Sequence, residues 1–209
     1  MQASTHSRTL LTGLLWSALV AIAQLAITAP ARAQAMQYEL DPEHTTVAFL
    51  VDHIGYAKVL GLFRSVRGNY RFDEATATLS ELRIEVETAS VFSNLRKRDD
   101  HLKGPDFFNS GEFPKMVFTA SSAKRTGERT FDIEGQLELL GKSQPMTLKA
   151  TWNKSAESPV GGFGRKPYLM GVSARGSLKR SAYGMNYAVA NGWVGDEIPL
   201  IIEFEAIRQ

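Results

Sequence analysis

Three histidines follow residue 33 of the chain, and they are the first candidates for chemistry. His44, His53 and His101 could together ligate a zinc ion that keeps an open fourth position. However, nine residues of a straight strand span roughly 30 Å, at about 3.3 Å per residue, so one ion could not contact both His44 and His53. We therefore expect no metal and no cofactor. A histidine that contacts a ligand, or that is hydrogen-bonded at the rim of the fold, is the better interpretation.

Sequence signatures of hydrolytic enzymes are missing. The chain contains neither Gly-x-Ser-x-Gly nor His-Glu-x-x-His. It has no cysteine, which excludes thiol catalysis, thiolate metal ligands and disulfides. No catalytic residue is therefore predicted. An enzyme that acts on a quinone or isoprenoid, with His53 or His101 as its acid–base group, remains an alternative.

Charged side chains are concentrated in "RKRDDHLKGPDFF", residues 96–108. This segment could form an entrance that handles an anionic head group, because arginine suits phosphate. Arg98, Asp99 and His101 are the candidate rim residues. The alternative is a solvated helix face with local Asp–Arg pairs.

The elements that position these side chains are predicted to be β-strands. From Tyr38 onward, apolar and polar residues alternate, most clearly in "FDIEGQLEL" (residues 131–139), as in half-buried antiparallel strands. Roughly eight strands, most joined by short turns, are typical of a sandwich or a closed barrel. The segment Asn94–Lys103 lacks this alternation. We expect it to form a short helix over one end of the sheet, capped by Asn94 or Ser93.

Glycines within or beside the predicted strands favour the barrel over the sandwich. Glycine permits the bulges and the sharp coiling that closure requires. The glycines in question are Gly61, Gly68, Gly135, Gly171 and Gly176. A barrel interior can be filled by side chains or can hold a ligand, and the pattern alone leaves both open.

The stretch "HIGYAKVLGLFRSVRGNYRF", residues 53–72, is too irregular for a membrane helix and too apolar for an exposed loop. We expect residues 54–63 to form a bend and a short helical turn that faces the mouth or the lumen of the barrel. Gly55 and Gly61 would let the backbone turn sharply, while Lys58 and Arg64 remain in water.

Residues 1–33 have the layout of a secretory signal peptide. They contain no acidic residue, and a long apolar run precedes the pattern Ala31-Arg32-Ala33. We expect Sec-type export to the periplasm and no transmembrane span after cleavage, with an uncleaved anchor as the alternative. Without Arg8 and Arg32, 22 basic and 22 acidic residues balance, which gives no indication of a nucleic-acid partner. Residues 34–209 are then expected to form one domain.

The chain resembles the YceI-like family in four stretches, in the family's order, from about Tyr38 to the C-terminus. These are "TTVAFLVDHIGYAKVLGLFRSVRG", then "TASVFSNLRKRDDHLKGPDFFN" with "EFPKMVFTA" after it, then "FDIEGQLELLGKSQPMTL", and finally "SAYGMN". The positions that match the family's pattern are His44, His53, Gly61, Phe63, Arg98, Asp99, His101, Leu102, Phe107, Phe108, Phe118, Gly135, Gly141 and Gly184.

The resemblance implies an all-β fold, an extended lipocalin-like antiparallel β-barrel of about eight strands with a short helix at one end. It also implies a periplasmic, non-catalytic protein whose elongated apolar cavity binds, and could transport or store, a polyisoprenoid or isoprenoid quinone. The same resemblance suggests a homodimer. A stress-response structural module with a filled core is a further alternative. The residues expected to contact the ligand are Phe49, Val51, His53, Phe63, Phe108, Phe118, Phe131, Ile133, Leu137, Met146, Leu148 and Met170, and those expected at the head group or rim are Arg98, Asp99 and His101.

Overall fold

Residues 34–160, 164 and 166–209 are described by the structure, a computed structural model of the whole chain. The predicted signal peptide, residues 1–33, lies outside the described residues. The strands are β1 (Met36–His53), β2 (Ala57–Phe63), β3 (Val66–Asp73), β4 (Thr78–Glu87), β5 (Val91–Phe92), β6 (Lys115–Ala120), β7 (Lys124–Arg125), β8 (Thr130–Leu139), β9 (Lys142–Glu157), β10 (Tyr168–Lys179) and β11 (Glu197–Arg208), and the helices are η1 (Thr88–Ser90), α1 (Arg96–Lys103) and η2 (Arg180–Tyr183). None of the described helices is long and apolar enough to cross a membrane.

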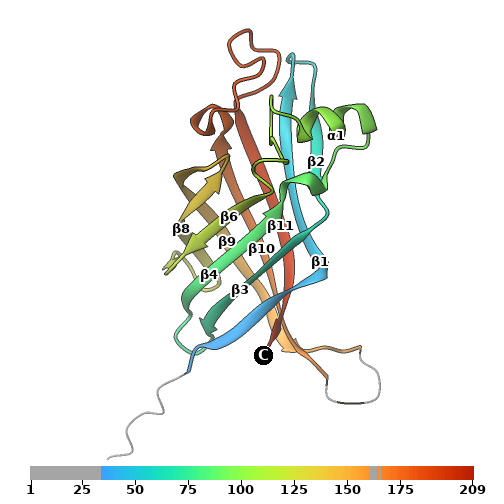
Figure 1. Cartoon of the computed structure of the whole chain (residues 1–209). Coiled ribbons are helices and arrows are strands. Elements are labelled where there is room, and N and C mark those ends of the chain that lie inside the picture. The colour runs from blue at the N-terminus through green and yellow to red at the C-terminus, as the bar shows by residue number, and fades with distance from the viewer. Residues whose placement is uncertain (1–33, 161–163, 165) are drawn as a thin grey trace, which may run out of the picture. The chain divides into compact units, whose positions relative to one another are not determined.

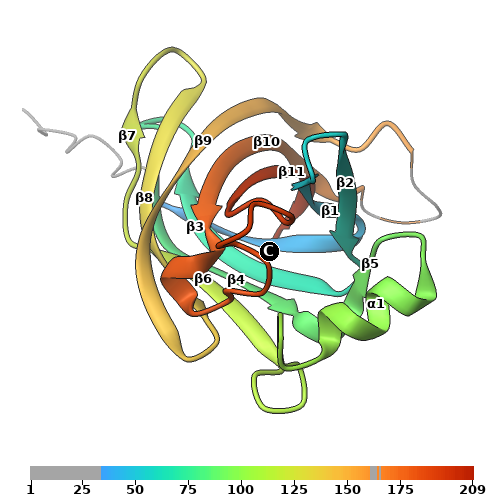
Figure 2. The same ribbon diagram turned by 90° about the horizontal axis from the view of Figure 1, so that it is seen from above.

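Eight antiparallel strands close into a barrel (Figures 1 and 2). Their order is β1-β3-β4-β6-β8-β9-β10-β11, and β11 pairs with β1 to complete the ring. Because β11 and β1 pair with each other, neither is an open edge of the ring. Strands β2 and β5 extend the sheet beyond β1, and β7 pairs with β8. The predicted barrel with a short helix at one end is therefore confirmed.

Strands β1 and β2 form a hairpin that projects past the ring, beside α1 (Figure 1). The predicted helical turn over residues 54–63 is wrong, because β2 pairs with β1 in unbroken register along its whole length. The turn itself is confined to three residues, where Ile54 and Gly55 take positive φ angles of 56° and 72°. Gly61 does not bend the chain: it lies within β2, directly opposite Phe49.

Helix α1 begins at Arg96, and neither predicted residue caps it. Leu95 holds the N-cap position without a side-chain cap bond. Asn94 has a left-handed φ of 62°, whereas a capping residue needs an extended backbone. Ser93 donates its backbone N–H and its hydroxyl to the Asp99 carboxylate, at 2.7 and 2.5 Å. Asp99 thus fixes the strand-to-helix connection from within the first turn of α1.

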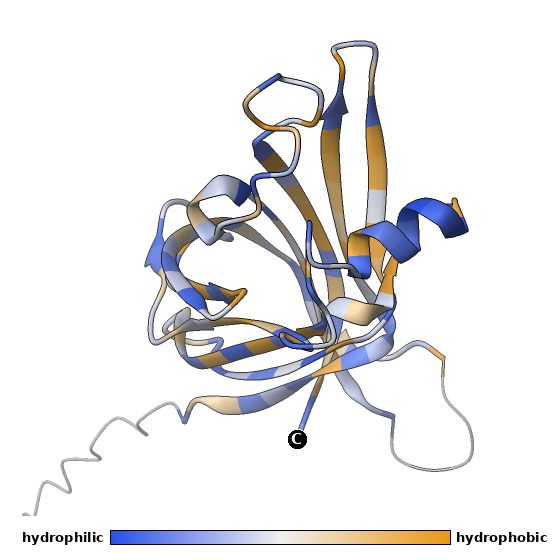
Figure 3. Cartoon of the chain, turned by 45° about the horizontal axis from the view of Figure 1, so that its top comes forward, coloured by the Kyte–Doolittle hydropathy of each residue, from blue (hydrophilic) through white to orange (hydrophobic). Residues whose placement is uncertain are grey.

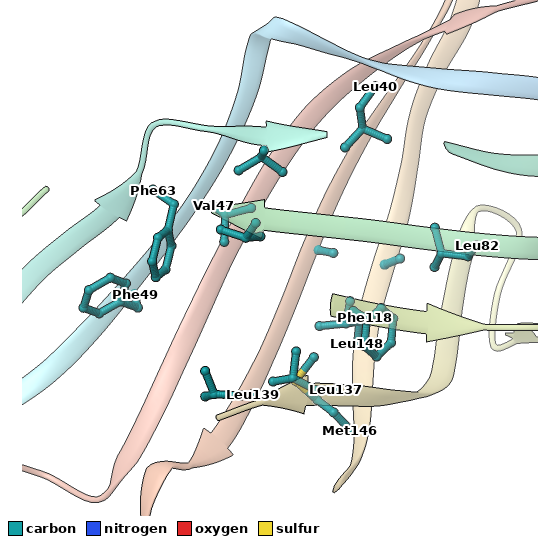
Figure 4. Close-up of a cluster of buried hydrophobic side chains, with 14 of the residues drawn as sticks. Leu40, Val47, Phe49, Phe63, Leu82, Phe118, Leu137, Leu139, Met146 and Leu148 are labelled. Atoms are coloured by element: carbon teal, nitrogen blue, oxygen red, sulfur yellow. The ribbon is translucent and has the colours of Figure 1, made fainter. Parts of the chain in front are cut away.

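The apolar core lies on the inner face of the barrel. Successive side chains of a strand point to opposite faces, so each strand of the ring contributes alternate residues to one buried cluster. Figure 4 shows Leu137, Leu139, Met146 and Leu148 from β8 and β9 turned toward the same interior as Phe118 from β6. The core is therefore the wall of a tube rather than a layer between two sheets.

Candidate ligand cavity

The inside of the barrel holds a cavity of about 380 Å³. This volume falls within the range of small-molecule pockets, about 300–1,000 Å³, and it favours a ligand-holding interior over a filled core. All twelve residues predicted to contact a ligand line this cavity, although the contact itself stays a prediction. They are Phe49, Val51, His53, Phe63, Phe108, Phe118, Phe131, Ile133, Leu137, Met146, Leu148 and Met170.

Glycines in the wall have two different roles. A Cβ on Gly135 would overlap the ring of Phe118, so Gly135 provides the space in which that aromatic side chain lies against β8. Gly171 lies at a register irregularity between β10 and β9, which is the bulge-forming role that the sequence suggested. Glycine positions alone could not separate these roles.

At the end of the barrel beside α1, residues of α1, of the β1–β2 hairpin and of the segment 184–196 line the cavity, and we call this end its mouth (Figure 1). The backbone N–H of Ile54 donates to the Trp193 carbonyl at 3.0 Å, which ties the hairpin to residues 184–196. The rings of His101, Phe107 and Tyr187 pack together, with centroids 5.0 to 5.3 Å apart. This aromatic cluster narrows the mouth beside α1.

Arg180 is a buried cation in the wall near the mouth, with 2% of its surface exposed. Its guanidinium donates to the carbonyls of Gly195, Met185, Tyr187 and Val194, each at 2.8 Å. Burial lowers its pKa. Arg180 therefore holds residues 184–196 in place through their backbone carbonyls. The sequence analysis missed this role, because backbone partners leave no pattern of residue types.

The three predicted rim residues lie at this end, but their polar groups have partners within the chain. The Arg98 guanidinium donates to the hydroxyl and the carbonyl of Ser93, at 2.7 and 2.5 Å. Asp99 is buried against Ser93 and does not line the cavity, whereas Arg98 and His101 do. His101 Nε2 lies 2.9 Å from the Asp106 carboxylate. A head-group role for the three stays a prediction.

Exposed apolar side chains gather around the mouth. Figure 3 shows apolar colour on the projecting hairpin, at the start of α1 and on residues 184–196. The large apolar residues that are exposed there are Ile54, Tyr56, Leu60, Leu95, Tyr187 and Trp193. Val160, which follows β9, is also exposed. Strand β9 ends, and β10 begins, at the other end of the barrel (Figure 1).

The other end is closed by a polar network around Glu74. The Tyr38 hydroxyl donates to one Glu74 oxygen at 2.5 Å, and the hydroxyls of Ser155 and Tyr168 bond to the other. Burial and the nearby carboxylate raise the pKa of Tyr38. The Tyr38 ring stacks on Tyr70, with centroids 5.2 Å apart and planes within 9°. Tyr70 lines the cavity beside this network, and we call this end of the cavity its floor. None of these residues was predicted to contact a ligand.

His44 lies outside the cavity, in an exposed cluster at a bulge of β1. Its Nδ1 is 2.7 Å from Oδ2 of Asp41, which raises the pKa of His44. Asp41, His44 and Glu205 could offer three ligand atoms within 4.8 Å of one another. Among the described residues, no such cluster combines two histidines, so the three-histidine arrangement does not form in this part of the chain.

The sequence matches the YceI-like domain over residues 38–206. This match covers nearly all of the barrel. The chain belongs to the YceI-like family. It is 32% identical to a UPF0312 protein of Pseudomonas savastanoi pv. phaseolicola and 34% identical to one of Azotobacter vinelandii, and each alignment covers 88% of this chain and 93% of the relative.

Solved structures show the same barrel. The YceI protein of Campylobacter jejuni is 27% identical and aligns with a TM-score of 0.64 over 76% of this chain and 90% of that one. BcnA of Burkholderia cenocepacia aligns at 0.68 with 19% identity, over 79% and 98%. A polyisoprenoid binding domain from Saccharophagus degradans aligns at 0.63 with 12% identity, over 83% and 99%. At these low identities, the similarity to BcnA and to the Saccharophagus degradans domain shows a shared fold.

Proposed function

We propose that this YceI-like protein binds a long-chain isoprenoid lipid, a polyprenyl chain or an isoprenoid quinone, and carries it in the periplasm. The observation that carries the proposal is the apolar cavity of about 380 Å³ inside the closed barrel. The structural likeness to a domain described as polyisoprenoid-binding supports this class of ligand. The signal-peptide layout of residues 1–33 supports the compartment.

An apolar tube is enough to bind such a ligand without catalytic groups. Each buried CH₂ contributes about 0.8 kcal/mol, while association costs about 4–15 kcal/mol in lost freedom. A few isoprene units therefore offset the cost, and a longer chain binds more tightly. We propose accordingly that the protein binds and carries its ligand rather than transforming it.

The exposed apolar rim supports carriage between membranes over simple storage. Tyrosine and tryptophan are favoured at membrane interfaces, where one end of the ring is apolar and the other meets water. Tyr56 and Trp193 are 89% and 58% exposed, at the mouth through which a lipid would pass. In this proposal the rim contacts the bilayer while the lipid enters or leaves.

Filling the lumen tests the proposal. Ala150 and Ala174 are buried partners on β9 and β10, and both line the cavity. We expect Ala150→Phe to lower the affinity for an isoprenoid quinone about tenfold, because the new ring occupies lipid space. Thr151→Phe, on the exposed face of the same strand, is the matched control and should change the affinity less than twofold. An Ala150→Phe variant that folds and binds as tightly as wild type would show that the lipid lies elsewhere.

A further inference from the structure

One donor at the floor of the cavity has no partner. Within the described part of the chain, the buried side-chain polar atoms without a hydrogen-bond partner are the hydroxyls of Tyr70 and Ser110 and the indole nitrogen of Trp152. Two of the three, Tyr70 and Trp152, line the cavity. Buried polar groups without a partner are rare in folded proteins, and each calls for an explanation such as a bound ligand.

The hydrogen-bond network around Glu74 does not include the Tyr70 hydroxyl. Both oxygens of Glu74 already accept hydrogen bonds, one from Tyr38 and the other from Ser155 and Tyr168. Tyr70 is 4% exposed, stacks on Tyr38 and meets the edge of Phe204. The Tyr70 side chain lines the lumen, and its buried hydroxyl, which has no partner, is held in place beside the lumen by this packing.

Trp152 brings a second buried donor without a partner to the cavity wall. Its ring packs edge-on against Phe72, with centroids 5.5 Å apart. Phe72 and Tyr70 are alternate residues of β3, so both face the lumen. The indole N–H can only donate, and a buried phenol also donates readily. A ligand that satisfies both must carry hydrogen-bond acceptors.

The charge at the floor further restricts the ligand. Burial, with smaller contributions from Tyr38 and the Glu74 carboxylate, raises the pKa of Tyr70, so its hydroxyl keeps the proton that it donates. The negative charge of Glu74 nearby disfavours a second anion, such as a phosphate. At the mouth, in contrast, Arg98 and His101 are engaged with Ser93 and Asp106.

We propose that the closed end of the cavity is a head-group site for a neutral acceptor, a quinone carbonyl or a polyprenol hydroxyl, which binds to the Tyr70 hydroxyl and the Trp152 indole N–H. The lipid then enters head first, and its chain extends toward the mouth. This inference rests on the proposed function and adds to it the class of head group and the orientation of the lipid.

The test compares three probes on protein expressed as the full chain, purified and freed of lipid. The probes share one chain length: an isoprenoid quinone, the isoprenoid hydrocarbon and the isoprenyl phosphate. We expect Tyr70→Phe to weaken quinone binding about tenfold and to change hydrocarbon binding less than twofold. Tyr183→Phe is the control, because Tyr183 is equally buried but does not line the cavity; it should leave all affinities within twofold. The phosphate should bind wild type more weakly than the quinone.

The outcomes separate the two proposals. If quinone and hydrocarbon bind but Tyr70→Phe weakens neither, or weakens both equally, the head-group site is overturned while lipid binding stands. A phosphate that binds more tightly than the quinone overturns the neutral head group. If no probe binds wild type, lipid binding fails and the head-group site fails with it.

Discussion

Phe49 on β1 lies across Gly61 on β2, and the two residues are directly paired in the sheet. A Cβ on Gly61 would overlap the Phe49 ring. The ring also packs against Phe63 and Phe108, with centroids 5.5 and 6.5 Å away. This contact places three phenylalanines in the wall below the mouth and joins the hairpin to the segment that follows α1.

A methyl group at Gly61 should displace the ring. We expect Gly61→Ala to lower the free energy of unfolding by about 1–3 kcal/mol, the usual cost of overpacking. Gly171→Ala is the matched control, because the nearest atoms to its Cβ are 3.9 and 4.0 Å away. Denaturant unfolding of both variants measures the difference. Equal stability of the two would contradict the role of the Phe49–Gly61 contact.

Replacing the buried Arg180 should loosen the mouth. Lysine has three donors on one nitrogen and cannot reach four carbonyls that a planar guanidinium spans. We expect Arg180→Lys to cost about 2 kcal/mol, because a hydrogen bond from a charged group contributes about 1.5–3 kcal/mol. Amide hydrogen exchange should quicken in residues 184–196. Arg175→Lys, at an exposed site, should change neither the stability nor the amide exchange of residues 184–196. Unchanged exchange in Arg180→Lys would show that other contacts hold this segment.

The outer face of the barrel carries an acid-sensitive cluster around Glu85. Arg83, Lys115 and Arg67 hydrogen-bond to this carboxylate and lower its pKa from 4.5 to about 2. The folded pKa lies below the unfolded one, so the stabilisation is complete above pH 4.5 and is lost as the pH falls through about 2.

Glu85→Gln should therefore cost roughly 1–2 kcal/mol at pH 7, since surface ion pairs contribute about 0.2–1 kcal/mol each. The difference from wild type should stay constant down to about pH 5 and shrink between pH 4.5 and 2. Denaturant midpoints measured across this range provide the check. A difference that does not change with pH would rule out the ionised carboxylate as its source.

The apolar rim should govern how fast lipid leaves the barrel for a membrane. We expect Tyr56→Ser combined with Trp193→Ser to slow quinone transfer to anionic phospholipid vesicles several-fold without changing affinity. Val160→Ser is the control, because Val160 is 77% exposed and follows β9, which ends at the other end of the barrel (Figure 1). Transfer is followed by stopped-flow fluorescence. If Val160→Ser slows transfer as much as the double variant, the apolar residues at the mouth do not determine the transfer rate.

Much of the barrel could be predicted from the sequence, because alternation marks the inner face of each strand. Phe131, Ile133 and Leu137 follow that period, and all three line the cavity. Irregular segments were harder to predict. The start of α1 was misplaced because Ser93 and Asn94 are good capping residues by type, but the backbone at Asn94 is left-handed.

The polar ends of the cavity could not be found from sequence patterns. Glu74 meets Ser155 and Tyr168 across 81 and 94 residues of chain, and only closure of the barrel brings them together. Arg180 offers no local signal either, because its partners are backbone carbonyls. Whether the buried Tyr70 hydroxyl has a hydrogen-bond partner depends on neighbours that only the assembled fold brings together.

Mass spectrometry of an organic extract shows whether the barrel holds an isoprenoid lipid. The protein is expressed as the full chain and purified from the periplasm without detergent, so that a bound lipid is retained. We expect an isoprenoid lipid, a polyprenyl compound or an isoprenoid quinone, at close to one molecule per barrel. An extract without lipid, from protein that also takes up no isoprenoid quinone when offered it, would rule out isoprenoid binding as the function.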